Sequence, residues 1–340
     1  MTHSRLTAQG RQRGTTLVEL MVAITLGMLI MAALLALYVN ITRTNSEMSK
    51  SNRQIENGRF AIQVLQNDLV HAGFWAGARP GTPTAIPAPC LDSGSWDDAY
   101  KANLLGIPVQ GFADGSALGD CGVSGVLSDS DVLVVSHANT CAAGTAGCDG
   151  GADTGPHIQV SGCTTVTPPE AMYLIDDDAA KLTLHKKDCA AVAERRKIVT
   201  NIYYLASSNG QPTLMRAALI NGAFAAPQPL IEGIEAMRFE YGIDNVGKNG
   251  APISATNPGD GKPDAYVSCP AGGCTLDQLA NVVAIRIHVL ARNLEETKGY
   301  TDTKSYQLGE TTVSGSGAYK RHVFSTTVRL VNPSGRRETP

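Results

Sequence analysis

Residues 20–39 form an uninterrupted apolar segment, LMVAITLGMLIMAALLALYV, in which no side chain is charged. With a rise of about 1.5 Å per residue, a helix of this length spans about 30 Å, which is the hydrocarbon thickness of a bilayer. The preceding residues 1–14 contain Arg5, Arg11 and Arg13 and no acidic residue. Because positively charged flanks stay in the cytoplasm, the sequence predicts that everything after residue 40 lies across the membrane.

Three interpretations fit an apolar segment near an N-terminus. A cleaved signal peptide has a shorter apolar run and a small-x-small cleavage site, which does not stand out in the NITRTNSEM that follows residue 39. A plain single-pass anchor agrees with the length and the flanking charges. It leaves Glu19 unexplained, because an unpaired carboxylate in an apolar segment costs on the order of a few kcal/mol.

The third interpretation explains Glu19. The stretch Gly14–Leu20, GTTLVEL, resembles the processing motif of type IV prepilins and type II secretion pseudopilins. In that family a prepilin peptidase cuts after the glycine, the new N-terminus is methylated, and a glutamate pairs with the terminal amine of a neighbouring subunit. The resemblance implies cleavage between Gly14 and Thr15, N-methylation of Thr15, and charge pairing by Glu19, which removes the cost of burying each charge alone. Thr15 departs from the usual phenylalanine.

The helical pattern continues beyond the apolar segment. No proline occurs between Thr15 and His71, and apolar residues recur every seven positions. The apolar stripe widens after residue 60, which predicts a helix that protrudes first and then packs on a sheet. Gly73 is the expected end of this helix. The recurring residues are Ile41, Met48, Ile55, Ile62 and Leu69.

Residues 77–340 have a different composition. Of the 35 glycines and 17 prolines in the chain, all but five glycines lie there, between short apolar segments. Alternating apolar and polar residues suit an antiparallel sheet with one covered face, and the N-terminal helix is the expected cover. The sequence predicts a pilin-like α+β fold in which a long helix, half transmembrane and half amphipathic, packs on a sheet with long loops. The expected strands are Asp131–His137, Ile198–Leu205, Glu235–Tyr241, Asn281–Arg292 and Arg321–Val331.

Eight cysteines all follow the apolar segment. An even number of cysteines on the translocated side of a membrane predicts disulfides that hold the loops together. Cys141 with Cys148 and Cys269 with Cys274 are possible pairs, because each would close a short loop; the other pairings stay open. Zinc is the alternative, but the sequence contains no Cys-x-x-Cys.

The sequence offers little support for a catalytic or cofactor site. It contains no Gly-x-Ser-x-Gly or His-Glu-x-x-His, and residues 242–249 resemble a P-loop but have Asn249 where Ser or Thr binds magnesium. We therefore expect no enzyme activity, no cofactor and no structural metal. Asp244, Asp260 and Asp264 lie in one polar loop and are a weak candidate for calcium. A formal net charge of −3 argues against nucleic-acid binding through a basic surface.

A second resemblance lies in the C-terminal half. Pro229–Glu235 and Phe239–Asp244, followed by Val282–Ile287 and the basic strand Lys320–Leu330, look like PilW-type minor pilins. This resemblance implies a structural component of a type IV pilus, in its priming or tip complex. The implied partners are other minor pilins, the major pilin, the prepilin peptidase, the inner-membrane assembly platform and a PilY-type tip adhesin.

Four segments follow from these patterns: a leader (1–14), a transmembrane assembly helix (15–39), an amphipathic helix (40–76) and a β-rich domain (77–340). The chain would start in the bacterial inner membrane with a periplasmic domain, and then enter a pilus on the cell surface. One alternative is a J-type minor pseudopilin of a type II secretion system. Another is a membrane-anchored periplasmic enzyme or binding protein, which predicts a convergent polar cluster that the sequence does not show.

Overall fold

The computed structural model describes residues 14–116, 118–119, 121–146, 148, 154–254 and 256–338. The chain forms two compact units, Met1–Lys50 and Ser51–Pro340. The leader arginines Arg5, Arg11 and Arg13 lie outside the described residues.

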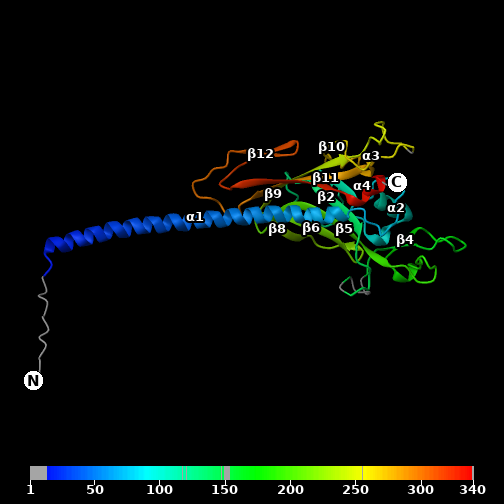
Figure 1. The fold of residues 1–340 in the computed structure, drawn as a ribbon, viewed down its shortest axis with the longest axis horizontal. Helices are drawn as coiled ribbons and strands as arrows, with labels where there is room; N and C mark the ends of the chain where they lie inside the picture. Colours follow the sequence, from blue (N-terminus) through cyan, green and yellow to red (C-terminus); the bar gives the residue numbers. More distant parts are fainter. Residues whose placement is uncertain are drawn as a thin grey trace, which may run out of the picture. The chain divides into compact units, whose positions relative to one another are not determined.

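One helix, α1 (Leu17–His71), crosses from the first unit into the second without interruption (Figure 1). The absence of proline allows this length, because every backbone N–H beyond the first turn can bond within the helix. Residues 14–46 are all exposed, and this part of α1 is long and apolar enough to cross a membrane. The helix ends two residues before Gly73, whose φ of +69° and close approach to Pro108 and Pro333 favour glycine.

The second unit contains two antiparallel sheets. The larger sheet has the order β1-β2-β5-β3-β4, and β6 joins it by pairing with β5 and also pairs with β7 and β8. Its strands are β1 (Val109–Phe112), β2 (Val132–Ala138), β3 (His157–Val160), β4 (Tyr173–Asp176), β5 (Arg195–Ser208), β6 (Gln211–Ile220), β7 (Ala223–Phe224) and β8 (Gln228–Glu232).

The second sheet has the order β10-β9-β11-β14, and a separate hairpin is formed by β12 and β13. In β11 the predicted alternation is confirmed: Ile285, Ile287 and Val289 are fully buried, and Arg286 between them is exposed. The strands are β9 (Ile234–Ile243), β10 (Ala265–Val267), β11 (Val282–Arg292), β12 (Ser305–Leu308), β13 (Thr311–Ser314) and β14 (Arg321–Arg329). Short helices are η1 (Ser93–Ser95), α2 (Asp98–Gly106), η2 (Ala179–Lys181), α3 (Leu276–Ala280) and α4 (Val331–Glu338).

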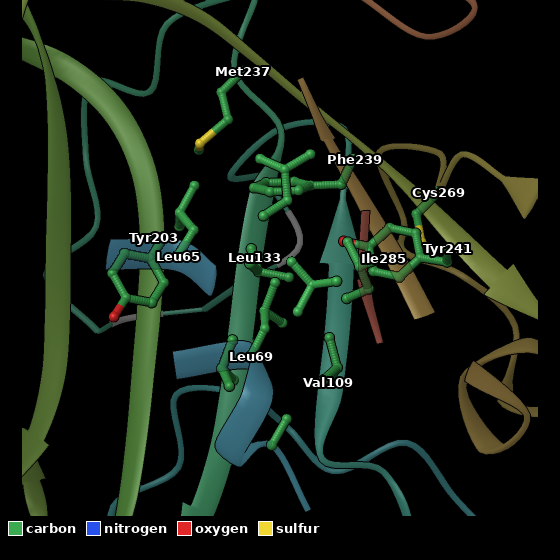
Figure 2. Close-up of a cluster of buried hydrophobic side chains, with 14 of the residues drawn as sticks. Leu65, Leu69, Val109, Leu133, Tyr203, Met237, Phe239, Tyr241, Cys269 and Ile285 are labelled. Atoms are coloured by element: carbon green, nitrogen blue, oxygen red, sulfur yellow. The ribbon is translucent and has the colours of Figure 1, made fainter. Parts of the chain in front are cut away.

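The expected α+β fold is confirmed, and the sheet is divided in two. All five expected strands are present, with ends within a few residues of the expected positions. The C-terminal half of α1 contributes Leu65 and Leu69 to one apolar cluster with residues from both sheets (Figure 2). Both leucines are fully buried, and Leu133 of β2 and Ile285 of β11 are members of the same cluster.

A buried polar contact connects α1 to the larger sheet. His137 Nε2 of β2 lies 2.9 Å from Asp68 Oδ1 of α1, and Asn201 Nδ2 of β5 donates to Asp68 Oδ2 at 3.0 Å. His137 Nδ1 lies 2.9 Å from the Ala138 carbonyl oxygen, so both ring nitrogens face acceptors. The ring of His71 is 5.7 Å away. Burial alone lowers the pKa of His137, but the hydrogen bond and charge of Asp68, with the Ala138 carbonyl, raise it overall.

The raised pKa predicts a pH-dependent stability. A histidine whose pKa is higher in the folded state stabilises the fold below its unfolded pKa, and this stabilisation is lost as pH rises through the folded value. The free energy of unfolding should therefore fall as pH rises above about 6.5. Denaturant unfolding of the full chain in detergent between about pH 6 and 9 measures this slope. His137→Gln should flatten it, whereas the exposed His322→Gln should not; an unchanged slope in His137→Gln contradicts the assignment.

Candidate functional site

The segment Gly14–Thr16 immediately precedes α1 and is not helical. All three residues are exposed, and no atom lies within 4 Å of the position that a Cβ on Gly14 would occupy. The fold of this chain therefore places no steric demand on Gly14. The backbone here is accessible to an external enzyme. From Leu17 onward the backbone belongs to α1 and bonds within the helix.

Thr16 and Glu19 cap the start of α1 reciprocally. The Thr16 backbone N–H donates to Glu19 Oε2 at 3.0 Å, and the Glu19 N–H donates to Thr16 Oγ1 at 3.3 Å. The Thr16 hydroxyl also donates to Glu19 Oε2, at 3.1 Å. This is a capping box, which satisfies N–H groups that the first turn leaves without partners. Among the described residues, Glu19 Oε1 accepts no hydrogen bond, so one carboxylate oxygen stays available.

Beyond its cap, α1 is apolar around its whole circumference as far as residue 39. Between residues 17 and 39 the polar side chains are Glu19, Thr25 and Tyr38. The Thr25 hydroxyl donates to the Met21 and Val22 carbonyl oxygens and needs no outside partner. A helix that is apolar on every side is stable only in a membrane or among other helices.

Four disulfides join all eight cysteines, and they include both pairs considered from the sequence. Two pairs are far apart in the chain, with separations of 31 and 26 residues, and no sequence spacing indicated them. The bridges are Cys90–Cys121, Cys141–Cys148, Cys163–Cys189 and Cys269–Cys274.

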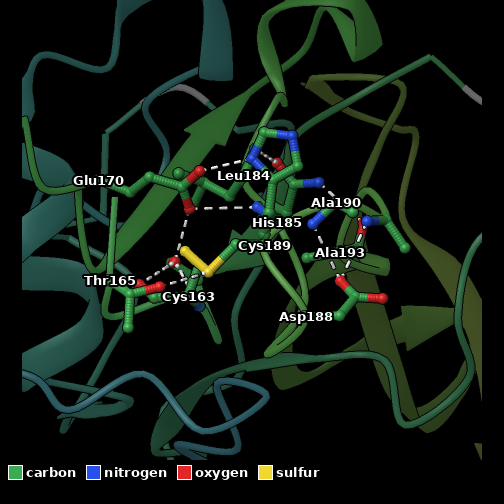
Figure 3. A network of polar contacts seen from close by, with 12 residues as sticks. Cys163, Thr165, Glu170, Leu184, His185, Asp188, Cys189, Ala190 and Ala193 are labelled. Atoms are coloured by element: carbon green, nitrogen blue, oxygen red, sulfur yellow. Dashed lines mark hydrogen bonds and ion pairs between the residues drawn. A yellow bond between two sulfur atoms is a disulfide. The ribbon is translucent and has the colours of Figure 1, made fainter. Parts of the chain in front are cut away.

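The Cys163–Cys189 bridge lies beside an ordered polar network (Figure 3). The Ser161 hydroxyl donates to Glu170 Oε2 at 2.6 Å, and the His185 backbone N–H donates to the same oxygen at 3.1 Å. The Ser161 hydroxyl, followed by His185, lowers the pKa of Glu170 to about 2. This loop is therefore held by both covalent and polar contacts, although it contains little regular secondary structure.

The candidate calcium residues have other partners. Asp244 Oδ2 lies 3.3 Å from Arg337 and accepts the Gly261 N–H, and Asp264 Oδ2 accepts the N–H groups of Asn245 and Val246. Asp260 lies 3.6 Å from Lys262. In the part of the chain that the structure describes, no three acidic, histidine or cysteine side chains are grouped to hold a metal ion. The geometry thus gives the calcium hypothesis no support.

A Ser–His–Glu arrangement occurs on the outer face of the second sheet. His288 Nδ1 lies 2.8 Å from Ser325 Oγ, and its Nε2 lies 3.5 Å from Glu240 Oε2. Arg286 shares Glu240, with its Nη1 also 3.5 Å from Oε2. All four residues stand on neighbouring strands, so the pairing register alone brings them together. We interpret this cluster as polar cross-strand pairs.

Family models match two parts of the chain. Residues 202–332 match the family described as Type IV Pilus-assembly protein W, and residues 9–35 match the prokaryotic N-terminal methylation motif. The chain is a PilW-type minor pilin. The first match begins within β5 and includes β9, β11 and β14, and the second includes Gly14, Thr15 and Glu19.

Other similarities of this minor pilin are distant. The comparison with curated proteins finds no significant match. A type IV-like pilin from Thermus thermophilus is similar in structure, with 12% sequence identity and a TM-score of 0.36 over 82% of this chain and 96% of that one.

Thr16 is the one residue of this segment that the processing motif does not indicate. The Thr-x-x-Glu spacing from Thr16 to Glu19 before an apolar run is nevertheless a recognised signal for a helix start. Gly14, Thr15 and Glu19 lie together at the beginning of α1, as their spacing requires.

The disulfides of this minor pilin should differ in their effect on stability. Cys269 and Cys274 are buried in the main apolar cluster, whereas Cys141 and Cys148 are partly exposed. Both bridges close short loops, so the entropic contributions are similar and burial decides the difference. Replacing Cys269 and Cys274 by serine should cost about 2–5 kcal/mol, and replacing Cys141 and Cys148 should cost less. Denaturant unfolding of both double variants tests this, and equal losses would contradict it.

Proposed function

We propose that this minor pilin is inserted in the bacterial inner membrane, cut between Gly14 and Thr15, N-methylated at Thr15, and incorporated in a type IV pilus through α1. The observation that carries the proposal is the exposed, non-helical segment before a capped helix of 55 residues. A peptidase needs backbone that can extend, and this segment is exposed and not held in a helix. The leader, residues 1–14, is removed in this step.

We infer a topology with the N-terminus in the cytoplasm and residues 77–340 in the periplasm. The three leader arginines support this orientation, because the flank carries no acidic residue. The four disulfides also support it, since the periplasm is oxidising and the cytoplasm keeps thiols reduced.

The proposed role is structural, without catalysis. The specific partners we infer are other minor pilins and the major pilin along α1, the prepilin peptidase at Gly14, the inner-membrane assembly platform, and a PilY-type adhesin at the pilus tip. In this role residues 15–39 pack against other pilin helices, and the body formed by residues 77–340 contacts neighbouring subunits. The amphipathic segment, expected as residues 40–76, is helical only as far as His71 and connects the two.

Glu19 has a second role in this proposal. Its Oε2 holds the cap, and its Oε1 is available to a terminal amine of a neighbouring subunit. Pairing with that amine would neutralise two charges in an apolar bundle without breaking the capping box. The carboxylate would then set the axial position of one helix against the next.

Cleavage is tested by the mass of the mature protein. The chain isolated from cells with active peptidase should begin at Thr15, with a methylated amine. Gly14→Val should leave the leader attached, because a branched side chain hinders the extended backbone in the peptidase site. Gly10→Ala, four residues earlier, is the control and should be processed normally. An intact leader in the wild-type chain would refute the proposed cleavage.

The pairing role of Glu19 can be separated from capping. Glu19→Gln keeps an acceptor that can complete the capping box but removes the charge. Thr16→Val removes the cap hydroxyl and keeps the charge. We expect both variants to be cleaved, and Glu19→Gln to enter pili about tenfold less, since an unpaired buried amine costs well over about 1.4 kcal/mol.

Immunoblots of sheared pili measure the incorporation. Thr16→Val should be incorporated nearly as well as the wild type, because capping boxes contribute only about 0.5–2 kcal/mol. Glu19→Ala should behave like Glu19→Gln. Normal incorporation of both Glu19 variants would show that the charge pairing is dispensable.

A further inference from the structure

A pocket of about 710 Å³ lies in the second unit, beside the end of α1. Its walls include the last residues of α3 and of α4, which Figure 1 shows near the C-terminus. Thr82 and Asp277 on its rim are exposed, so the pocket is open to solvent. Five prolines make its walls stiff, because their backbone φ is fixed. They are Pro80, Pro83, Pro108, Pro258 and Pro333.

The helix α4 is held against the rest of the unit by polar contacts. Asn332 Nδ2 donates to the Ala72 carbonyl oxygen at 3.1 Å, directly after α1. The Ser334 hydroxyl donates to the Gly261 carbonyl oxygen at 2.7 Å, and Ser334 is fully buried. The last turn of α4, which reaches the pocket, is therefore positioned by the fold.

One of the two arginines in this turn is fully paired. Arg337 Nη1 lies 3.3 Å from Asp244 Oδ2, and Arg337 Nη2 donates to Asn281 Oδ1 at 2.5 Å. Arg337 Nη2 also donates to the Ala280 carbonyl oxygen at 2.9 Å. The charge of Arg337 is thus balanced by a carboxylate within the fold.

The neighbouring Arg336 is different. Its Nη1 donates to the Gly73 carbonyl oxygen at 3.0 Å, but in the part of the chain that the structure describes no carboxylate pairs with it, and its Nε and Nη2 make no hydrogen bond. Burial, followed by the like charge of Arg337, lowers the pKa of Arg336. The end of α1 offers only a partial negative charge. Because arginine stays charged in proteins, a partly buried cation remains uncompensated in the pocket wall.

The unused groups of Arg336 suit a carboxylate. Nε and Nη2 lie on one edge of the planar guanidinium, and this edge can donate two parallel hydrogen bonds to the two oxygens of one carboxylate. The single negative charge of a carboxylate balances the single uncompensated charge. A phosphate group carries up to two negative charges at neutral pH, and Asp277 on the rim already adds one.

The open shape of the pocket favours a segment of a protein over a small molecule. Sites for small ligands enclose most of the ligand surface, whereas Thr82, Pro258 and Asp277 leave this pocket exposed. A carboxylate on a protein segment needs no enclosure, because other contacts of that protein keep it close at high effective concentration. Proline rings then provide apolar contact for the neighbouring side chains of the segment.

We propose that Arg336 binds the carboxylate of an aspartate or glutamate on an extended segment of a neighbouring pilus subunit, which lies in this pocket. The inference rests on the proposed incorporation of the chain in a pilus. Arg336 would then connect two elements: its Nη1 holds α4 to the end of α1 through Gly73, and its Nε and Nη2 hold the partner segment.

Two variants remove this contact in different ways. Arg336→Gln removes the charge, and Thr82→Trp fills the pocket from its exposed rim without altering Arg336. In cells that assemble pili, both full-length variants should be cleaved normally and incorporated at least about tenfold less than the wild type. Arg336→Lys keeps the charge without the two-donor edge and should recover part of the loss. Asp277→Asn is the matched control, which should be incorporated at least as well as the wild type.

The pocket-filling variant separates binding from a purely structural role of Arg336. Thr82→Trp leaves the bond from Arg336 to Gly73 in place, so the free energy of unfolding of the full chain in detergent should match the wild type. A destabilised Arg336→Gln together with normal incorporation of Thr82→Trp would overturn the proposal, because Arg336 would then only hold α4 on α1.

A small diazirine side chain at Gly81 identifies the occupant. Gly81 lines the pocket, is exposed, and has no atom within 4 Å of its Cβ position, so the crosslinker fits without blocking the pocket. In assembled pili the crosslinked peptide should contain an aspartate or glutamate of another subunit. Changing that acid to lysine should lower incorporation, and combining it with Arg336→Glu should restore it.

The remaining outcomes are distinct. Crosslinks only to residues 339–340 of the same chain, crosslinks to a segment without acidic residues, or no crosslink in assembled pili would overturn the assigned occupant. Normal incorporation of both Arg336→Gln and Thr82→Trp would overturn this inference alone. A wild-type chain that does not enter pili would overturn the proposed function, and this inference with it.

Discussion

The burial of the C-terminal half of α1 is the contact on which the rest of the structure depends. Leu65 and Leu69 have no exposed surface and belong to a cluster that includes residues of both sheets (Figure 2). Burying such side chains contributes about 1.5–3 kcal/mol each. Without the helix, the inner faces of both sheets would be exposed to water, so the helix is an integral part of the body as well as its link to the membrane.

Polar side chains determine how α1 sits in the body. Gln54 donates to the Ala291 carbonyl oxygen at 2.7 Å and to that of Lys320 at 3.0 Å, and Asn57 donates to the Glu232 carbonyl oxygen at 3.0 Å. Asp68 of α1 makes the remaining polar contacts, with His137 and Asn201 of the larger sheet. Apolar packing tolerates a small rotation or slide of a helix, but these directional bonds do not. They define the rotation and the axial position of the C-terminal half of α1 on the two sheets.

The two halves of α1 differ in composition because they lie in different environments. Its first half has no polar face, and its few polar groups are satisfied within the helix or at its start, by Thr25 and by the Thr16–Glu19 cap. Its second half has an apolar side towards the sheets and a polar side towards water. The first half is therefore suited to a membrane or to the company of other helices, and the second half to the sheets of this chain.

Much of the fold followed from local patterns. The apolar segment, the processing motif around Gly14 and Glu19, and the alternation in β9, β11 and β14 each depend on residues close together in the chain, and the sequence determined them by itself. β6 was missed because Pro212 and the mixed sequence of Gln211–Ile220 hide the alternation, and Cys90–Cys121 and Cys163–Cys189 because their partners are distant. Only the tertiary structure decided the division into two sheets, the burial of Asp68 beside His137, and the position of β14 at the end of its sheet. Strand order, disulfide pairing and buried polar contacts join residues that are remote in sequence, and no local pattern specifies which of the many possible pairs will form.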